Sequence, residues 1–212
     1  MAMNMHATSA TVLGALAVLA LSTGTANAQG QMRSGTNELH LFTGYLFGDD
    51  LTDAPVTPLG PTPELDDDWL WGLRYGYNFS EMWGIDISAG WSPNSATNLA
   101  GGDIDLDVTL VDVSAIWHFT PQSPVVGYTL AGVGYAFSDL DTTFPAIVDG
   151  VPIRIDDDDG FTLNAGIGAK WFVSDTVMIR GEARYRYIDK LVDELDDSLN
   201  TFDVTLGVGW QF

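Results

Sequence analysis

Residues 201–212, with the sequence TFDVTLGVGWQF, alternate strictly between apolar side chains and polar or small ones. The apolar positions of this run are Phe202, Val204, Leu206, Val208, Trp210 and Phe212. A period of two predicts a β-strand whose two faces meet different environments. In water, a long apolar strand face that ends on an aromatic residue favours aggregation. In a membrane barrel both strand edges are paired and the apolar face meets lipid, so the run predicts a strand of that kind.

Seven earlier segments alternate in the same way, namely 36–47, 68–79, 82–91, 109–119, 125–137, 161–173 and 176–188. The connections between the eight segments are short after the second, fourth and sixth and long after the others, at 48–67, 92–108, 138–160 and 189–200. Short turns on one side and long loops on the other are typical of outer-membrane barrels, with the short turns in the periplasm. The sequence therefore predicts an all-β fold, an eight-stranded antiparallel up-and-down transmembrane β-barrel in the outer membrane.

One segment changes phase near its start. Ile104, Leu106 and Val108 lie on the parity that becomes polar later in the same strand. This change indicates either a β-bulge near Val108 or an extension of the strand above the membrane.

The first 28 residues differ from the rest of the chain. An apolar run is followed by small residues that end in Ala26-Asn27-Ala28, which is typical of a cleavable secretory signal. The segment before the apolar run has no Lys or Arg, which leaves an uncleaved anchor helix as the alternative, although the run is short for a membrane span. We therefore expect a signal peptide at 1–28, a periplasmic tail at 29–35 and the barrel domain at 36–212.

Composition excludes several classes of function. The net charge of −21 with only 8 basic residues argues against nucleic-acid binding, because nothing would neutralise phosphates. The chain has no cysteine and therefore no disulfide or thiolate chemistry.

A soluble lipocalin-like barrel is the main structural alternative. The aromatic residues disfavour it, because they gather near strand ends on the apolar parity, where a membrane barrel has its interfacial belts.

Two stretches resemble a known family. GYTLAGVGYAF at 127–137 and AGIGAKWFVSDTVMIRGEARYRY at 165–187 are similar to the eight-stranded barrel of outer membrane protein A-like (OmpA-like) proteins. The resemblance covers about 36–212, the barrel domain only, without the C-terminal peptidoglycan-binding domain that many such proteins carry. It implies that the run ending in Phe212 is the signal read by the barrel-assembly machinery. It also implies that narrow conductance through the lumen can occur in such a barrel.

Ten charged residues fall on the inward parity of the predicted strands. They are the acids Glu38, Asp86, Asp112, Glu182 and Asp203 and the bases Arg74, Lys170, Arg180, Arg184 and Arg186. An unpaired buried charge is costly, so a balanced set predicts a paired network, with Glu182 at its centre. Eight strands leave a bore that side chains just fill. We expect a structural plug, and the alternative is a gate that opens a thin path when the pairs exchange.

Most other acids lie in or beside the long connections. Weak candidates for cation ligands are Asp103, Asp105, Asp107, Asp156, Asp157, Asp158 and Asp159. Carboxylates suit Ca²⁺, but DIDLD at 103–107 lacks the glycine and closing glutamate of an EF-hand loop. We therefore expect a solvated acidic rim and no metal site. Divalent cations that bridge these loops to lipopolysaccharide phosphates are the alternative.

An enzyme that modifies lipid A is a less favoured hypothesis. Acyl transfer or hydrolysis needs a histidine beside a serine nucleophile or an acid. His40 and His118 are the histidines after the signal, and both are expected to face inward, where Ser114 and Asp112 share the parity of His118. Successive inward positions lie about 6.6 Å apart along a strand, and no Gly-x-Ser-x-Gly or His-Glu-x-x-His motif is present.

The expected function is a structural or surface-interaction role through long acidic extracellular loops. The alternative is a narrow pore or small-solute conduit gated by the charged lumen. The expected partners are outer-membrane lipid, lipopolysaccharide and the barrel-assembly machinery. Divalent cations at the acidic loops are the alternative to a bare acidic rim, and no nucleic acid is expected. No cofactor is expected.

Overall fold

The computed structural model describes residues 32–48, 64–97, 104–140, 144–148, 151–155, 158–189 and 198–212. Within these ranges no helix is long and apolar enough to cross a membrane. The expected signal at 1–28 lies outside the described residues, as do most of the acidic connections.

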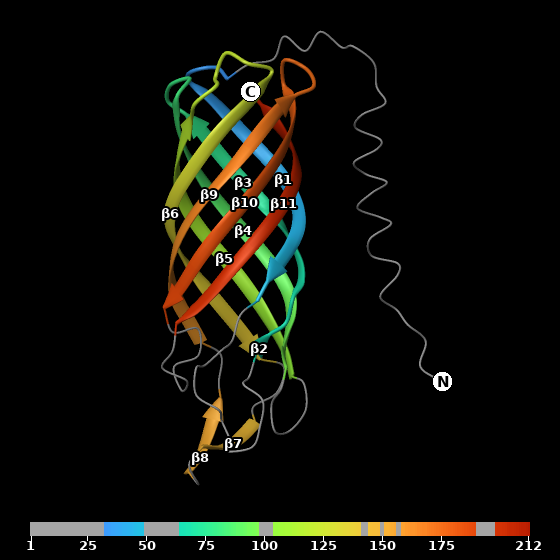
Figure 1. The fold of residues 1–212 in the computed structure, drawn as a ribbon, viewed down its shortest axis with the longest axis vertical. Helices are drawn as coiled ribbons and strands as arrows, with labels where there is room; N and C mark the ends of the chain where they lie inside the picture. The colour runs from blue at the N-terminus through green and yellow to red at the C-terminus, as the bar shows by residue number, and fades with distance from the viewer. Residues whose placement is uncertain are drawn as a thin grey trace, which may run out of the picture.

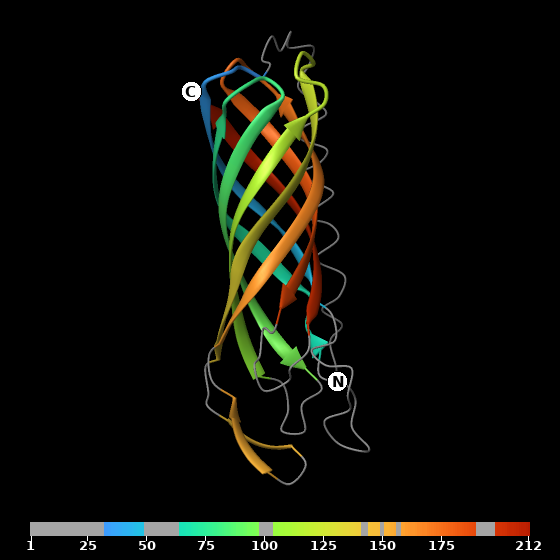
Figure 2. The same cartoon turned by 90° about the vertical axis from the view of Figure 1, so that its left-hand side faces the viewer.

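Eight long strands of the described residues form a closed antiparallel barrel (Figures 1 and 2). They are β1 (Thr36–Phe47), β3 (Asp68–Asn78), β4 (Trp83–Thr97), β5 (Ile104–His118), β6 (Val125–Leu140), β9 (Asp158–Phe172), β10 (Val177–Asp189) and β11 (Leu199–Gln211). Each strand pairs with its neighbours in the sequence, and β1 pairs with β11 to close the sheet. The predicted up-and-down barrel is confirmed.

Three short strands lie at the end of the barrel opposite the C-terminus. β2 (Glu64–Leu65) pairs with the end of β4. β7 (Phe144–Val148) and β8 (Val151–Ile155) form a separate antiparallel hairpin that projects beyond the barrel (Figures 1 and 2). We call this end the loop end and the opposite end, which carries the tight turns and the C-terminus, the short-turn end.

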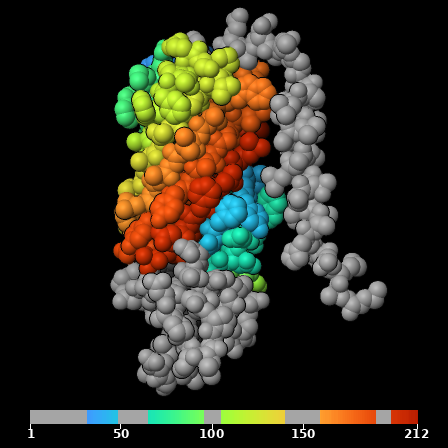
Figure 3. Space-filling view, in the orientation of Figure 1, coloured from blue at the N-terminus to red at the C-terminus, as the bar shows by residue number. Residues whose placement is uncertain are grey.

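Side chains alternate between the outer wall and the interior along every barrel strand. In β11 the burial pattern alternates without interruption from Thr201 to Gln211, and the outward residues in this range are five of the six apolar ones of the predicted closing run. The sixth, Phe212, follows the strand and is exposed. Large apolar side chains on the outward faces are 36% to 65% exposed. A continuous apolar wall of this kind would be unstable in water and is suited to lipid. On the face of the barrel seen in Figure 3, the side chains of adjacent strands form tilted bands that make up this wall.

Aromatic side chains gather at both ends of the outer wall. Trp83 and Trp117 lie 6.4 Å apart between ring centroids near the short-turn end. Trp71 and Trp91 lie 4.9 Å apart toward the loop end. Amphipathic rings favour the level of lipid headgroups, so these pairs mark the two membrane interfaces.

Several strands extend further toward the loop end than the sequence indicated. The connection predicted at 92–108 shrinks, because β4 runs to Thr97 and β5 begins at Ile104. The pairing of β4 with β5 is uninterrupted from Trp83↔Trp117 to Ala96↔Ile104. The bulge considered near Val108 is therefore wrong, and the strand extension explains the phase change.

The register does change on the other side of β4. β3 pairs with β4 up to Trp71↔Trp91, and pairing resumes where the Asp66 amide donates to the Ser95 carbonyl oxygen at 2.9 Å. Between these two pairings, residues 67–70 on the β2–β3 side lie opposite residues 92–94 on β4, so the β2–β3 side has one residue more. Pro93 falls inside the interval and has no amide hydrogen to donate, which explains why the β3–β4 ladder stops there.

Candidate functional site

The inward residues of β10 run along the whole length of the lumen. From the short-turn end to the loop end they are Met178, Arg180, Glu182, Arg184, Arg186 and Ile188, all of them buried. A period of two places these residues in one row along the barrel interior. The row is apolar at both ends and charged in between. The largest apolar clusters of the lumen lie at its two ends, and a smaller one of Ile116, Tyr128 and Leu130 lies among the charged residues.

Glu182 lies at the centre of the charged zone. Its carboxylate accepts hydrogen bonds from Arg74 Nη2 at 2.9 Å, Arg180 Nη2 at 2.7 Å and Arg184 Nη2 at 2.8 Å. Arg184 Nε donates a further bond at 3.1 Å, and the Tyr128 hydroxyl is the fourth donor residue, at 2.7 Å. Three cations around one buried carboxylate leave an excess of positive charge, so further acids are needed nearby.

Asp112 and Asp203 supply that charge on the loop side of Glu182. Asp112 Oδ2 accepts from Arg184 Nη1 and from Arg186 Nη2, each at 2.9 Å. Arg186 Nη1 also pairs with Asp203. The Asn164 amide donates to Asp112 Oδ1 at 3.0 Å, which satisfies its second oxygen. Both oxygens of this buried carboxylate therefore have partners.

Asp86 completes the centre on the short-turn side. Arg180 Nη2 donates to Asp86 Oδ2 at 2.7 Å, and Arg74 Nε lies 3.7 Å from the same oxygen. Arg180 Nε donates to the Tyr128 hydroxyl at 2.7 Å. The Arg180 guanidinium also lies over the Tyr128 ring, 4.7 Å from its centroid, where a cation–π contact adds to the ion pairs.

A smaller group lies nearer the short-turn end. Lys170 Nζ donates to Glu38 Oε2 at 2.6 Å, and the same oxygen is 2.9 Å from His40 Nε2. Lys170 Nζ also lies 3.1 Å from His118 Nε2. All four side chains are buried. With this group, the structure places each of the ten charged residues singled out in the sequence in the lumen, and each belongs to at least one ion pair.

Tyr128 lies at the centre of the network, although it is not among the charged residues that the inward parity selects. It is paired in register with Gly168 on β9. A Cβ atom at position 168 would lie 2.2 Å from the Tyr128 hydroxyl oxygen, so only glycine leaves room for this ring. A tyrosine on the inward parity opposite a glycine was the signal available in the sequence.

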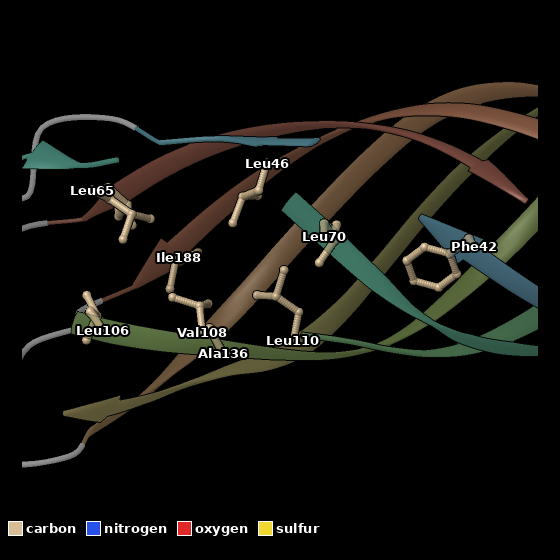
Figure 4. Packing of buried hydrophobic residues seen from close by; sticks show 10 residues of the cluster. Phe42, Leu46, Leu65, Leu70, Leu106, Val108, Leu110, Ala136 and Ile188 are labelled. Atoms are coloured by element: carbon tan, nitrogen blue, oxygen red, sulfur yellow. The ribbon is translucent and has the colours of Figure 1, made fainter. Parts of the chain in front are cut away.

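An apolar cluster fills the lumen at the loop end (Figure 4). Its members come from seven strands and are Phe42, Leu46, Leu65, Leu70, Leu106, Val108, Leu110, Ala136, Ile188 and Leu199. Leu106 and Val108 are the residues whose phase was anomalous in the sequence, and both point inward and are about 1% exposed. A second apolar cluster closes the short-turn end and comprises Met32, Val126, Phe172 and Met178.

The residues considered for catalysis have other partners. The Ser114 hydroxyl donates to Asn164 at 3.1 Å, and the His118 Nε2 atom faces Lys170. His40 faces Glu38. Among the described residues, neither histidine is hydrogen-bonded to a serine, as a serine nucleophile would require.

Of the weak candidates for cation binding, Asp103, Asp156 and Asp157 lie outside the described residues. Asp105 and Asp107 lie on β5 and Asp158 and Asp159 on β9, all close to the loop end. In the described ranges, no three Asp, Glu, His or Cys side chains gather in a way that could hold a metal ion.

Comparisons with known proteins agree with this architecture. The structure is similar to Neisserial surface protein A (TM-score 0.58, 17% identity, 84% of this chain and 100% of that one). It is also similar to OprG of Pseudomonas aeruginosa (TM-score 0.57, 16% identity, 87% and 99%). A third similar structure is the N-terminal barrel domain of Pseudomonas aeruginosa OprF (TM-score 0.50, 17% identity, 84% and 98%). At these identities the likeness concerns the fold, and no curated protein matches the chain in sequence.

A family model describes nearly the whole sequence. The model for the outer membrane protein beta-barrel domain matches residues 9–212. Together with the closed barrel and its apolar wall, this match places the protein in the outer membrane. In outer-membrane barrels the short turns face the periplasm. The chain belongs to the outer membrane protein beta-barrel domain family.

Proposed function

We propose that this barrel has a structural role in the outer membrane and offers a contact surface at its extracellular loop end. The observation that carries the structural part is the filled lumen. Charged side chains pair across its middle, and apolar clusters pack at both ends. An eight-stranded barrel has room for side chains and little else, so such a filling favours a rigid plug over a channel. No catalytic role is needed for this function.

The contact surface rests on what the loop end presents. The β7–β8 hairpin projects there beyond the barrel (Figures 1 and 2). Exposed acids surround the same end, among them Asp105, Asp139 and Asp189. Loops carried on a rigid scaffold are common binding elements. Lipopolysaccharide is the expected neighbour of this surface, with divalent cations between its phosphates and the acids as a proposal.

The outer wall has two proposed partners of its own. Outer-membrane lipid would cover the apolar face, since the large side chains there are exposed. The barrel-assembly machinery would read the outward residues of β11 that end in Phe212. Phe212 exchanges two backbone hydrogen bonds with Asn37 at 2.8 and 2.9 Å across the closing strand pair, so this recognition would act where the barrel is completed.

Replacing residues 141–157 by a short Gly-Ser turn tests the surface role. This change removes the hairpin and leaves the barrel strands intact, so we expect whole cells to lose adhesion while heat-modifiable migration and abundance stay normal. Shortening the connection 98–103 at the same end serves as a matched control for loop length. Unchanged adhesion in the hairpin variant would contradict a contact role for this hairpin, and altered solute uptake would favour the conduit.

A narrow conduit gated by the lumen charges is the second candidate. The observation in its favour is that three guanidinium groups share the Glu182 carboxylate, so the pairs could exchange partners. Planar-bilayer recording of the refolded protein decides between the two. We expect a baseline without ion steps, because both ends of the lumen are packed with apolar side chains. Discrete conductance steps would overturn the plug.

A lipid A-modifying activity has less support than either. It would need a histidine next to a serine or an acid on a free path to lipid. His40 does lie beside the Glu38 carboxylate, but both side chains are buried in the lumen, where Glu38 also binds Lys170. Ser114 and His118 are buried as well, and their side chains contact Asn164 and Lys170.

A further inference from the structure

Residues 32–35 precede β1 and cross the short-turn end of the barrel. We call them the N-terminal strap. The Met32 side chain is about 1% exposed and packs with Val126, Phe172 and Met178, which come from β6, β9 and β10. The three barrel residues are themselves fully buried. A residue outside the barrel wall therefore completes the apolar cluster at the mouth of the lumen.

Polar contacts tie the strap to all three short turns. The Met32 amide donates to the Pro121 carbonyl oxygen at 3.3 Å, in the β5–β6 turn. Arg33 Nη2 donates to the Asp175 carbonyl oxygen at 3.1 Å, in the β9–β10 turn. The Ser34 hydroxyl donates to the Phe79 carbonyl oxygen at 3.2 Å, in the β3–β4 turn. Segments that are far apart in sequence are thus joined through three consecutive residues.

Further contacts fix the path of the strap. Arg33 Nε and Nη2 lie 2.8 and 3.1 Å from the side-chain oxygen of Gln211, in the amide orientation that satisfies both groups. The Thr36 hydroxyl donates to the Arg33 carbonyl oxygen at 2.7 Å. Gly35 has a φ of 73°, which non-glycine residues rarely adopt, and its amide donates to the Asn78 carbonyl oxygen at 2.7 Å. The chain turns there from the mouth into β1.

We propose that the N-terminal strap seals the periplasmic mouth of the lumen, where Met32 covers the apolar cluster and Arg33 and Ser34 hold the strap in place. Because the Met32 side chain covers apolar side chains, removing it exposes them to water from the periplasmic side. Arg33 and Ser34 bind carbonyl oxygens of turns, so loss of these bonds leaves the hydrogen bonds between the barrel strands intact. This seal acts at one end of the barrel and is distinct from the charged zone in the middle of the lumen.

Thiol accessibility tests this proposal, because the chain has no native cysteine. The reporter is Val126→Cys, a small change at a fully buried position under Met32. The protein is refolded in lipid vesicles and treated with a bulky, water-soluble maleimide that can reach the short-turn end. Two other single-cysteine variants serve as the exposed and the buried controls. Gln122→Cys lies in an exposed turn, and Ser114→Cys lies deep in the lumen.

We expect Val126→Cys to be protected while Gln122→Cys reacts freely. Adding Met32→Ser with Arg33→Ala should raise the labelling rate of Val126→Cys by about tenfold or more, as expected for a local opening. Ser114→Cys should stay protected in the same background. Three results would overturn the proposal that the N-terminal strap seals the lumen. They are rapid labelling of Val126→Cys with an intact strap, an unchanged rate after the strap substitutions, or loss of protection at Ser114→Cys as well, which would make the strap a determinant of the whole fold.

Discussion

Replacement of Glu182 by glutamine is expected to lower the free energy of unfolding by about 3–5 kcal/mol, the cost of breaking a buried ion pair from one side. Glutamine keeps the shape of the side chain but removes its charge, so Arg74, Arg180 and Arg184 lose the carboxylate they share. Asp86 would still pair with Arg180 and, at 3.7 Å, with Arg74, and Asp112 would still pair with Arg184, which argues for the lower part of that range. Urea unfolding in lipid vesicles, followed by gel mobility or tryptophan fluorescence, measures the change.

Asp189→Asn is the matched control for this experiment. It removes one carboxylate from the same strand, at an exposed position near the loop end. An exposed substitution of this kind usually changes stability by about 0.5 kcal/mol or less. Equal effects of the two substitutions would show that the network around Glu182 does not stabilise the barrel.

The second large effect is expected on the lipid face. Leu206→Arg places a charge in the middle of β11, where the leucine side chain is 46% exposed on the outer wall. The cost at the membrane midplane is about 2–4 kcal/mol, because the guanidinium cannot reach water without distorting the bilayer. The same unfolding measurement applies.

A depth control separates this cost from a general effect of arginine. Ser95→Arg lies on the outward parity of β4, two outward positions beyond Trp91, where the expected cost is about 0–1 kcal/mol. Leu206→Met controls for the loss of the leucine itself. If Leu206→Arg and Ser95→Arg had the same effect, β11 would not face the membrane core as the wall of exposed apolar side chains indicates.

The contrast between β11 and β5 shows how far the sequence alone could go. The alternation in β11 predicted its strand, its lipid face and its closing position, because the two solvents of a barrel wall impose a period of two. The same rule left the first part of β5 open between a bulge and a strand extension, because Leu106 and Val108 are apolar and yet face inward. At the loop end, the inside of the barrel is packed with apolar side chains, so inward-facing residues there are apolar and no longer polar.

The partners within the lumen needed three dimensions. The sequence identified ten inward charges and favoured Glu182 as their centre, because β10 carries three arginines beside it. The pairing of Lys170 with Glu38 joins residues 132 positions apart, and Tyr128 enters the network only because Gly168 lies opposite it. Strand tilt and register decide such contacts, and neither can be read from local periodicity.

The sequence by itself determined that this chain builds a barrel wall between lipid and a polar interior, because the alternation of side chains records the two environments directly. Only the tertiary structure decided what fills that interior. Two apolar clusters enclose the charged zone, and Met32 closes one of them from outside the wall. The physical reason is that a lumen is lined by every strand at once, so its contents depend on which residues of distant strands meet at the same height.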